Sequence, residues 1–174
     1  MNAEVDKTPP DRIGAALQPA SQRASTGHSI ARMAEGGALT TRQLEQQRLI
    51  HRDESVREQS DAFREVRTRL LSLAGEHNFV TLVVPVSLHS GGSFVARNLA
   101  AAFAFDEAKT SLLIDCNLRH PAQHKALAGD PSRGGLIDYL DHPALGIESS
   151  LYRTGMPRLR LIPTGRVREN AGEY

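Results

Sequence analysis

The sequence of 174 residues is poor in the residues that several classes of protein depend on. Its single cysteine, Cys116, excludes an intrachain disulfide and fits a reducing cytoplasm. It has no tryptophan and only 5% aromatic residues, and its 40% hydrophobic content suffices for one modest core. The sequence also has no large excess of charge of either sign, because 21 Lys and Arg are balanced by 20 Asp and Glu. The formal charge of +1 therefore does not predict nucleic acid as a partner.

Long apolar runs are absent as well. No stretch approaches the roughly 18 apolar residues that a membrane helix needs. The first residues lack the hydrophobic region of a signal peptide. We therefore expect a cytoplasmic protein that is neither exported by that route nor membrane-spanning, and that reaches the inner membrane only peripherally, through a partner.

The chain divides into two parts near residue 60. Residues 1–30 contain several Pro, Gly and Ser residues and no apolar periodicity, which is typical of a tail. Residues 40–58 could form a polar helix, with Leu44, Leu49 and Ile50 as its only large apolar side chains. We interpret residues 1–59 as a flexible N-terminal tail and linker, and residues 60–174 as a folded domain.

The folded part reads as an α/β domain. The apolar spacing of residues 60–75 predicts a helix, and the β-branched run 79–86 predicts a strand buried on both faces. A loop with two glycines, a helix at 94–105 and a strand at 111–115 follow, which together form a βαβ unit. Helices are expected at 121–127, 135–140 and 147–152, and a last strand at 159–165. These elements predict part of a doubly wound, parallel sheet with helices on both faces.

The loop between the first strand and its helix is a candidate phosphate site, because helix N-termini favour anions. A P-loop reads G-x-x-x-x-G-K-[S/T], in which the lysine neutralises the β- and γ-phosphates and the hydroxyl binds Mg²⁺. Here residues 86–93 read VSLHSGGS, so Gly91 and Ser93 fit and Gly92 stands in place of the lysine. The motif taken alone leaves two interpretations, a phosphate loop and an ordinary structural loop.

The second strand ends in Asp115, at the edge where parallel sheets bind ligands. Asp115 could hold Mg²⁺ or its water there, and Arg119 could reach a phosphate or carboxylate. In the alternative interpretation Asp115 caps the following turn and Arg119 is solvated. The sequence favours neither.

Five motifs occur in order between residues 61 and 165. They are DAFREVR at 61–67, HSGGSFVARNLA at 89–100, LLIDCNLRHP at 112–121, HK at 124–125 with GLIDYL at 135–140, and LRLIPTG at 159–165. Together they resemble the cytoplasmic domain of the bacterial tyrosine autokinases of capsular and exopolysaccharide synthesis, which are P-loop proteins. The stretch GALTT at 37–41 resembles the linker of the exosortase-associated type.

This resemblance implies a role for each matching residue. The nucleotide-binding set comprises Gly91, Gly92, Ser93, Asp115 and Arg119, with ATP and Mg²⁺ as the implied cofactors. Ser93 and Asp115 would hold the Mg²⁺, and Asp115 is the catalytic candidate if the protein is active. The motif at 61–67 implies subunit contacts through Asp61, Arg64 and Arg67, and Tyr174 is the candidate phospho-acceptor.

The sequence departs from the family where the chemistry is expected. Gly92 replaces the lysine, His89 replaces the first loop glycine, and Asn117 replaces the second aspartate of the second motif. The sequence also ends before a Walker B strand, so we expect a shortened domain. Loss of one charge contact to a transition state commonly costs roughly 10²–10³ in rate.

These departures favour a non-catalytic member that acts as an adaptor or regulator of a chain-length and export complex. Its expected partners are a membrane chain-length determinant or polysaccharide export protein, or an active kinase paralogue, with a homo-oligomer as a further expectation. The alternative is an active, divergent P-loop tyrosine kinase or ATPase completed by a partner chain.

Overall fold

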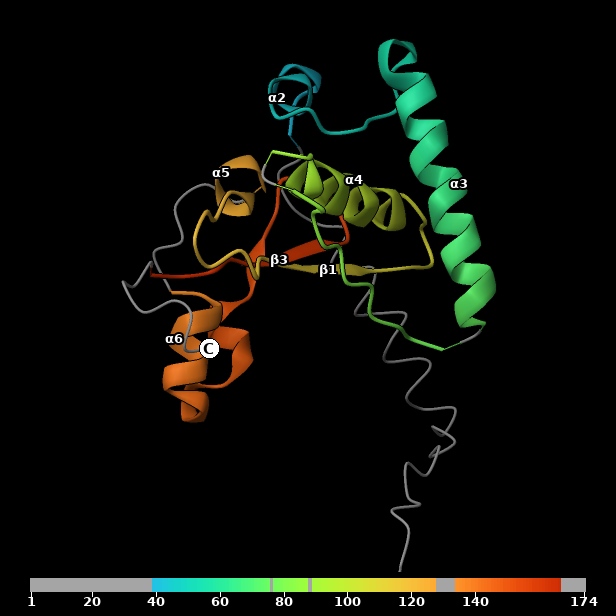
Figure 1. Ribbon diagram of the computed structural model, residues 1–174. Helices are drawn as coiled ribbons and strands as arrows, with labels where there is room; N and C mark the ends of the chain where they lie inside the picture. Colours follow the sequence, from blue (N-terminus) through green and yellow to red (C-terminus); the bar gives the residue numbers. More distant parts are fainter. Residues whose placement is uncertain (1–38, 76, 88, 128–133, 167–174) are drawn as a thin grey trace, which may run out of the picture.

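The computed structural model describes residues 39–75, 77–87, 89–127 and 134–166 (Figure 1). Their longest helices are α3 (Arg57–Ala74) and α4 (Gly92–Ala104), and the short ones are α2 (Thr41–Gln46), α5 (Gln123–Leu127) and α6 (Leu136–Asp141). The strands are β1 (Ser111–Ile114), β2 (Tyr152–Arg153) and β3 (Leu159–Ile162). Single 3₁₀ turns occur at Glu54–Val56, Pro143–Leu145 and Ile147–Ser150. No helix of the described ranges is long and apolar enough to cross a membrane.

The sheet of the described residues has three strands in the order β1-β3-β2. β1 runs parallel to β3, with Leu113 opposite Leu161, whereas β2 runs antiparallel to β3. The prediction of a wholly parallel sheet is therefore wrong for β2. The connection between β2 and β3 is too short for a parallel crossover, which takes about a dozen residues, so these strands form a hairpin. The end of the predicted helix 147–152 contributes Tyr152 to this hairpin.

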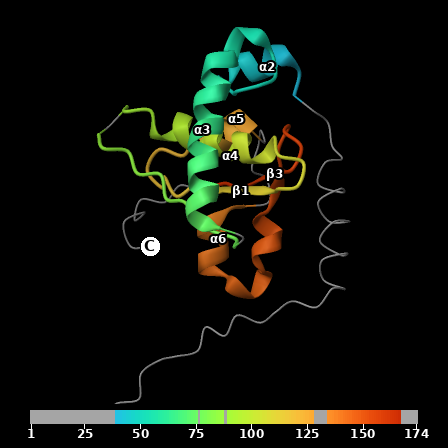
Figure 2. The same cartoon turned by 90° about the vertical axis from the view of Figure 1, so that its right-hand side faces the viewer.

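Helices lie on both sides of the sheet, as the sequence predicted. Figures 1 and 2 show α4 and α5 on one side and α6 on the other. The small side chains of α4, which include the fully buried Ala101 and Ala102, let this helix approach the sheet closely. α3 packs on the outer side of α4, where Phe63 meets Phe94 edge to face with 5.9 Å between ring centroids.

The packed unit begins before residue 60, which corrects the predicted linker. Leu49 is 1% exposed and Ile50 is 0% exposed, and both belong to the main core cluster. The N–H of Leu39 donates to the carbonyl of Gly155 at 2.8 Å. Leu49 and Ile50 suffice to join this segment to the core because tertiary contacts bury both side chains completely. The polar composition of the segment did not indicate this burial.

The predicted strand at 79–86 forms no strand and belongs to no sheet, which corrects the expectation of a buried strand. Val80 is 97% exposed and Val86 is 96% exposed. The β-branched residues favour an extended backbone, but a strand also needs a neighbour, and no described strand pairs with this segment. The first half of the predicted βαβ unit is thus unpaired.

Candidate functional site

The candidate phosphate loop leads directly into the N-terminus of α4. Gly91 is the N-cap in a left-handed conformation, with φ of 86°, and no side chain caps the helix. His89 also has a positive φ, 62°. The hydroxyl of Ser90 donates to the carbonyl of Ser87 at 2.8 Å, which closes the loop locally. Gly91, Gly92 and Ser93 therefore lie at a helix N-terminus, the position at which amide groups and the helix dipole favour an anion.

Gly92 is packed closely against the preceding segment. A Cβ atom built at Gly92 would lie 3.0 Å from the Cβ of Pro85. That separation is shorter than an ordinary contact between carbon atoms, so a larger residue requires Pro85 to shift. The glycine at the lysine position is thus matched to the observed conformation of the loop.

Asp115 is buried and its carboxylate is occupied by backbone amides. It is 4% exposed. Its Oδ1 accepts from the N–H of Asn117 at 3.2 Å, and its Oδ2 accepts from those of Ala122 and Gln123, both at 3.1 Å. The capping interpretation of Asp115 is therefore what the structure shows: the carboxylate holds the turn after β1 and the N-terminus of α5. A role in binding Mg²⁺ stays a prediction.

A second contact joins the two parts of the candidate site. The side-chain amide of Gln123 donates to the carbonyl of Ser93 at 3.1 Å, and Gln123 itself is 3% exposed. Ser93 and Asp115, which are far apart in the sequence, thus lie at the same end of β1. Arg119 is exposed and forms no hydrogen bond or ion pair with the described residues.

The three predicted contact residues of α3 have different surroundings. Arg64 pairs with Asp61 at 2.9 Å on the surface of the helix. Arg67 is half-buried instead, and its Nη1 donates to the carbonyl of Ala102 at 2.9 Å. Arg67 therefore joins α3 to α4 within the chain, while Asp61 and Arg64 remain available to a second molecule.

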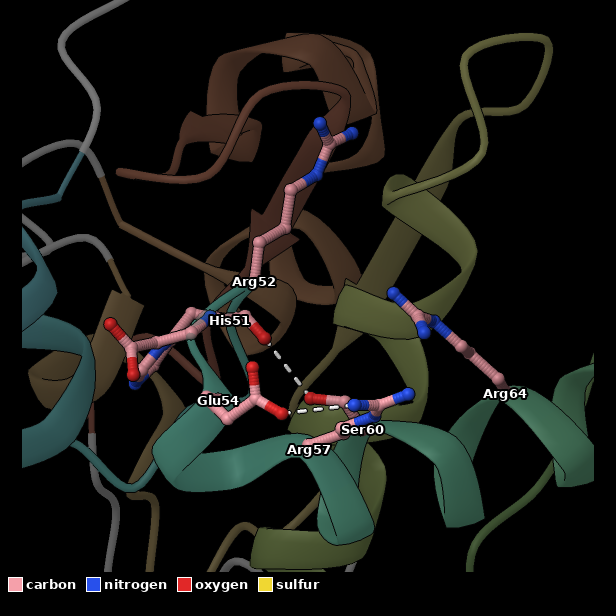
Figure 3. Close-up of a pocket in the computed structure, with 7 residues that line it drawn as sticks. His51, Arg52, Glu54, Arg57, Ser60 and Arg64 are labelled. Atoms are coloured by element: carbon pink, nitrogen blue, oxygen red, sulfur yellow. Dashed lines mark hydrogen bonds and ion pairs between the residues drawn. The ribbon is translucent and has the colours of Figure 1, made fainter.

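A polar pocket of about 220 Å³ lies at the start of α3 (Figure 3). Its lining carries charges of both signs. The lining residues are His51, Arg52, Asp53, Glu54, Arg57, Ser60 and Arg64. The hydroxyl of Ser60 donates to the carbonyl of His51 at 3.0 Å, and Arg57 pairs with Glu54 at 2.9 Å. Hydrogen bonds from Ser55 lower the pKa of Asp53. The sequence motifs pointed to Arg64 alone among these residues. The run of charged residues at 51–58 was a signal that could have indicated a polar site here.

Cys116 follows Asp115 and is exposed. Partial burial and the neighbouring Asp115 carboxylate raise the pKa of its thiol. The neutral thiol is a poor nucleophile and a poor metal ligand. Within the part of the chain that the structure describes, no three His, Cys, Asp or Glu residues form a group that could hold a metal. Tyr174 lies outside the described residues.

Comparison with known proteins gives matches among solved structures. No protein-family model matches the chain, and no curated protein matches it. Among solved structures the chain is similar to the chimerical protein CapA2B2, with a TM-score of 0.54 and 26% sequence identity. The match covers 72% of this chain and 57% of that one.

The structural similarity agrees with the motifs. It supports a mixed α/β fold of the partial P-loop type and a relationship to the kinase-like proteins of capsule biosynthesis. The chain spans little more than half the length of the matched structure.

Proposed function

We propose that this protein is a non-catalytic, kinase-like component of bacterial capsule or exopolysaccharide biosynthesis, which acts by binding as an adaptor or regulator. The observation that carries the proposal is Gly92, which occupies the lysine position of the phosphate loop in a motif order that otherwise resembles the tyrosine autokinases. The structural likeness to CapA2B2 supports the relationship to capsule biosynthesis.

The chemistry of phosphoryl transfer explains why this position matters. The reaction depends on positioning and on neutralising charge that spreads over the γ-phosphoryl oxygens. A glycine offers no cation, and its tight contact with Pro85 leaves no room for a larger side chain without a shift of Pro85. The loop retains amide groups at the start of α4, so a nucleotide would be held by backbone dipoles alone.

Asp115 contributes to the same conclusion. Three backbone amides use its carboxylate oxygens, and these contacts position α5. Coordination of Mg²⁺ would compete with contacts that the fold already uses. ATP and Mg²⁺ therefore belong to the proposal only as ligands of low affinity.

The proposed partners are a chain-length determinant or polysaccharide export protein of the membrane, or an active kinase paralogue. The charged surface at the start of α3 supports this idea, because Asp61 and Arg64 are about half exposed and Arg64 lines the polar pocket. Such a partner would hold the protein peripherally at the inner membrane. Exposed charges at an interface affect the rate and the orientation of association more than its affinity.

The test is a titration with ATP, with and without Mg²⁺, combined with assays for hydrolysis and tyrosine phosphorylation. We expect no turnover and no saturation up to roughly 1 mM nucleotide. A dissociation constant of that size corresponds to a binding free energy of only about −4 kcal/mol. ATP turnover or phosphate on Tyr139, Tyr152 or Tyr174 would instead establish an active, divergent enzyme.

A restoring variant separates the lysine from the rest of the loop. Gly92→Lys combined with Pro85→Gly supplies the cation and removes the Cβ atom that blocks it. This double variant is expected to gain nucleotide affinity at least tenfold, whereas Val95→Lys, which adds the same charge to an exposed position of α4, is not. Equal gains in both variants would show that general charge, and not the loop, attracts the nucleotide.

A further inference from the structure

The last described segment is rich in arginine and contains no acidic residue between positions 153 and 166. Its arginines are Arg153, Arg158, Arg160 and Arg166. Two of them have partners inside the chain, because the Nε of Arg158 donates to the carbonyl of Ala104 at 3.0 Å and Arg166 pairs with Asp138 at 3.6 Å. Arg153 and Arg160 have no carboxylate within ion-pair distance among the described residues.

These two arginines lie directly opposite each other in the antiparallel pair of β2 and β3. Opposite residues share a face, so both guanidinium groups leave the same side of the sheet. Partial burial, and then the charge of Arg153, lower the pKa of Arg160. The Nη1 of Arg160 donates to the carbonyl of Leu159 at 3.1 Å, a contact that brings no negative charge. Like charges in this position destabilise a strand pair, and an anionic group between them would relieve the repulsion.

The arginine pair lies on the side of the sheet that α4 does not cover. Leu161 belongs to the core cluster with the alanines of α4, so the alternation of β3 directs Arg160 and Ile162 to the opposite side. α6 covers one end of this side, where the N–H of Leu136 donates to the carbonyl of Pro163 at 2.8 Å and Ile162 is 2% exposed. Figure 1 shows α6 below that end of the sheet only.

Apolar side chains on β1 continue the row of arginines. Leu112 is the register partner of Arg160, and Ile114 follows on the same side of the strand. Leu112 is 50% exposed and Ile114 is 43% exposed. Neighbouring strands lie about 4.8 Å apart, so the row from Leu112 through Arg160 to Arg153 spans roughly 10 Å. We call these four residues the open sheet face, which is apolar on β1 and cationic on β3 and β2.

We propose that the open sheet face binds an acidic amphipathic helix of a partner protein. In a helix that crosses the strands with a leucine on Leu112, glutamates four and seven residues later lie about 6 and 10.5 Å from that leucine. Arg160 and Arg153 follow Leu112 at roughly 5 and 10 Å, so both carboxylates reach a guanidinium group. Carboxylate and guanidinium groups form two parallel hydrogen bonds, which favours this pairing over one with a neutral helix.

A protein helix suits this surface better than an anionic membrane does. Membrane surfaces attract clusters of basic residues, whereas this chain carries a formal charge of only +1. Helices already cover the other side of the same sheet, and a helix is the usual cover for an open side. The open sheet face shares no residue with the phosphate loop or the polar pocket, and the inference does not depend on the proposed function.

The first test measures peptide binding to the full chain by fluorescence anisotropy. The probe is a labelled, alanine-based helical peptide with one leucine and with glutamates four and seven residues after it. We expect saturable binding with a dissociation constant on the order of 0.1 mM, which weakens as salt is added. The control peptide carries its glutamates two and five residues after the leucine, on the opposite side of the helix, and should bind at least tenfold more weakly. Absence of binding, or equal binding of both peptides, overturns the proposal.

The second test reverses one charge of the face. Arg153→Glu should weaken binding of the probe at least tenfold, and it should raise the urea midpoint because the new carboxylate faces Arg160. The matched control is Arg42→Glu, which makes the same change of charge at an exposed position of α2 and should alter neither value. Loss of binding in a more stable variant excludes unfolding as its cause. Unchanged binding, or no gain in stability over the control, overturns the proposal.

The third test separates a protein partner from a lipid surface and examines the apolar half of the face. Phosphatidylcholine vesicles with about 30% phosphatidylserine should not sediment the chain in a way that depends on Arg153. Sedimentation that Arg153→Glu abolishes would assign the face to lipid and overturn the proposal. Leu112→Gln should weaken binding of the probe several-fold, because it removes an exposed apolar contact. An unchanged affinity in Leu112→Gln overturns the assignment of β1 to the face.

Discussion

Replacing Asn98 with alanine tests how the segment before residue 60 is attached to the domain. Asn98 is fully buried in α4. Its Oδ1 accepts from the N–H of Ile50 at 2.7 Å, and its Nδ2 donates to the carbonyls of Arg48 at 2.9 Å and Phe94 at 3.0 Å. One side chain thus satisfies backbone groups of a segment that lies about fifty positions away in the sequence.

The magnitude follows from what Asn98→Ala leaves unsatisfied. The N–H of Ile50 is buried with the rest of that residue, so it loses its partner in a place that water does not reach. An unsatisfied buried group costs about 1–3 kcal/mol. The carbonyl of Arg48 belongs to an exposed residue and can turn to water, and that of Phe94 still accepts the helical N–H. We therefore expect the free energy of unfolding to fall by about 2–4 kcal/mol once the small cavity is included.

Urea unfolding followed by circular dichroism measures this change. The matched control is Asn117→Ala, because Asn117 is exposed and its Oδ1 accepts a single bond, from the N–H of His120 at 3.1 Å. The control should cost about 1 kcal/mol or less. Hydrogen exchange gives an independent measurement, since the amide of Ile50 should lose protection in Asn98→Ala. If both alanine variants unfold at the same urea concentration, Asn98 does not attach the segment.

Three further predictions concern single residues. Asp115→Asn should lower the free energy of unfolding by about 1–3 kcal/mol in urea, because its amide nitrogen must face a backbone N–H; an unchanged midpoint contradicts the capping role. Ile50→Ala should cost about 2–4 kcal/mol, whereas Leu82→Ala, at a site that is 79% exposed, should change the stability of the monomer little; equal costs would mean that Ile50 is not buried. Cys116 should react with iodoacetamide more slowly in the folded than in the urea-unfolded chain near pH 7.5, because its folded pKa is raised. The unfolded thiol then loses its proton first, so stability should decline slightly as the pH rises through the alkaline range, and faster alkylation of the folded chain refutes the direction.

The helices of the domain could be predicted because their signals are local. The apolar spacing of α3 and the run of small residues in α4 lie within each segment, so the periodicity of the sequence is enough to find both. The prediction of a first strand was wrong for the opposite reason. Residues 79–86 have strand-forming residues, but pairing depends on a neighbouring strand, and a β-branched run carries no information on whether one is present.

The candidate site shows the same division. Gly92, Ser93 and Asp115 were found from their motifs, and the structure places Ser93 and Asp115 at the same end of β1. What Asp115 does there was left open by the sequence, because a carboxylate after a strand suits a cation and a turn equally. Its three bonds to backbone amides show that it caps the turn, while a role in binding Mg²⁺ stays a prediction.

The sequence by itself determined the α/β class, the positions of the main helices and the absence of a lysine from the phosphate loop, because these follow from residue types and short spacings. Only the tertiary structure decided that Leu49 and Ile50 belong to the core, that Arg67 binds the carbonyl of Ala102, and that the valine-rich segment stays unpaired. Each of these depends on contacts between residues far apart in the chain, and such contacts arise from packing that no local pattern records.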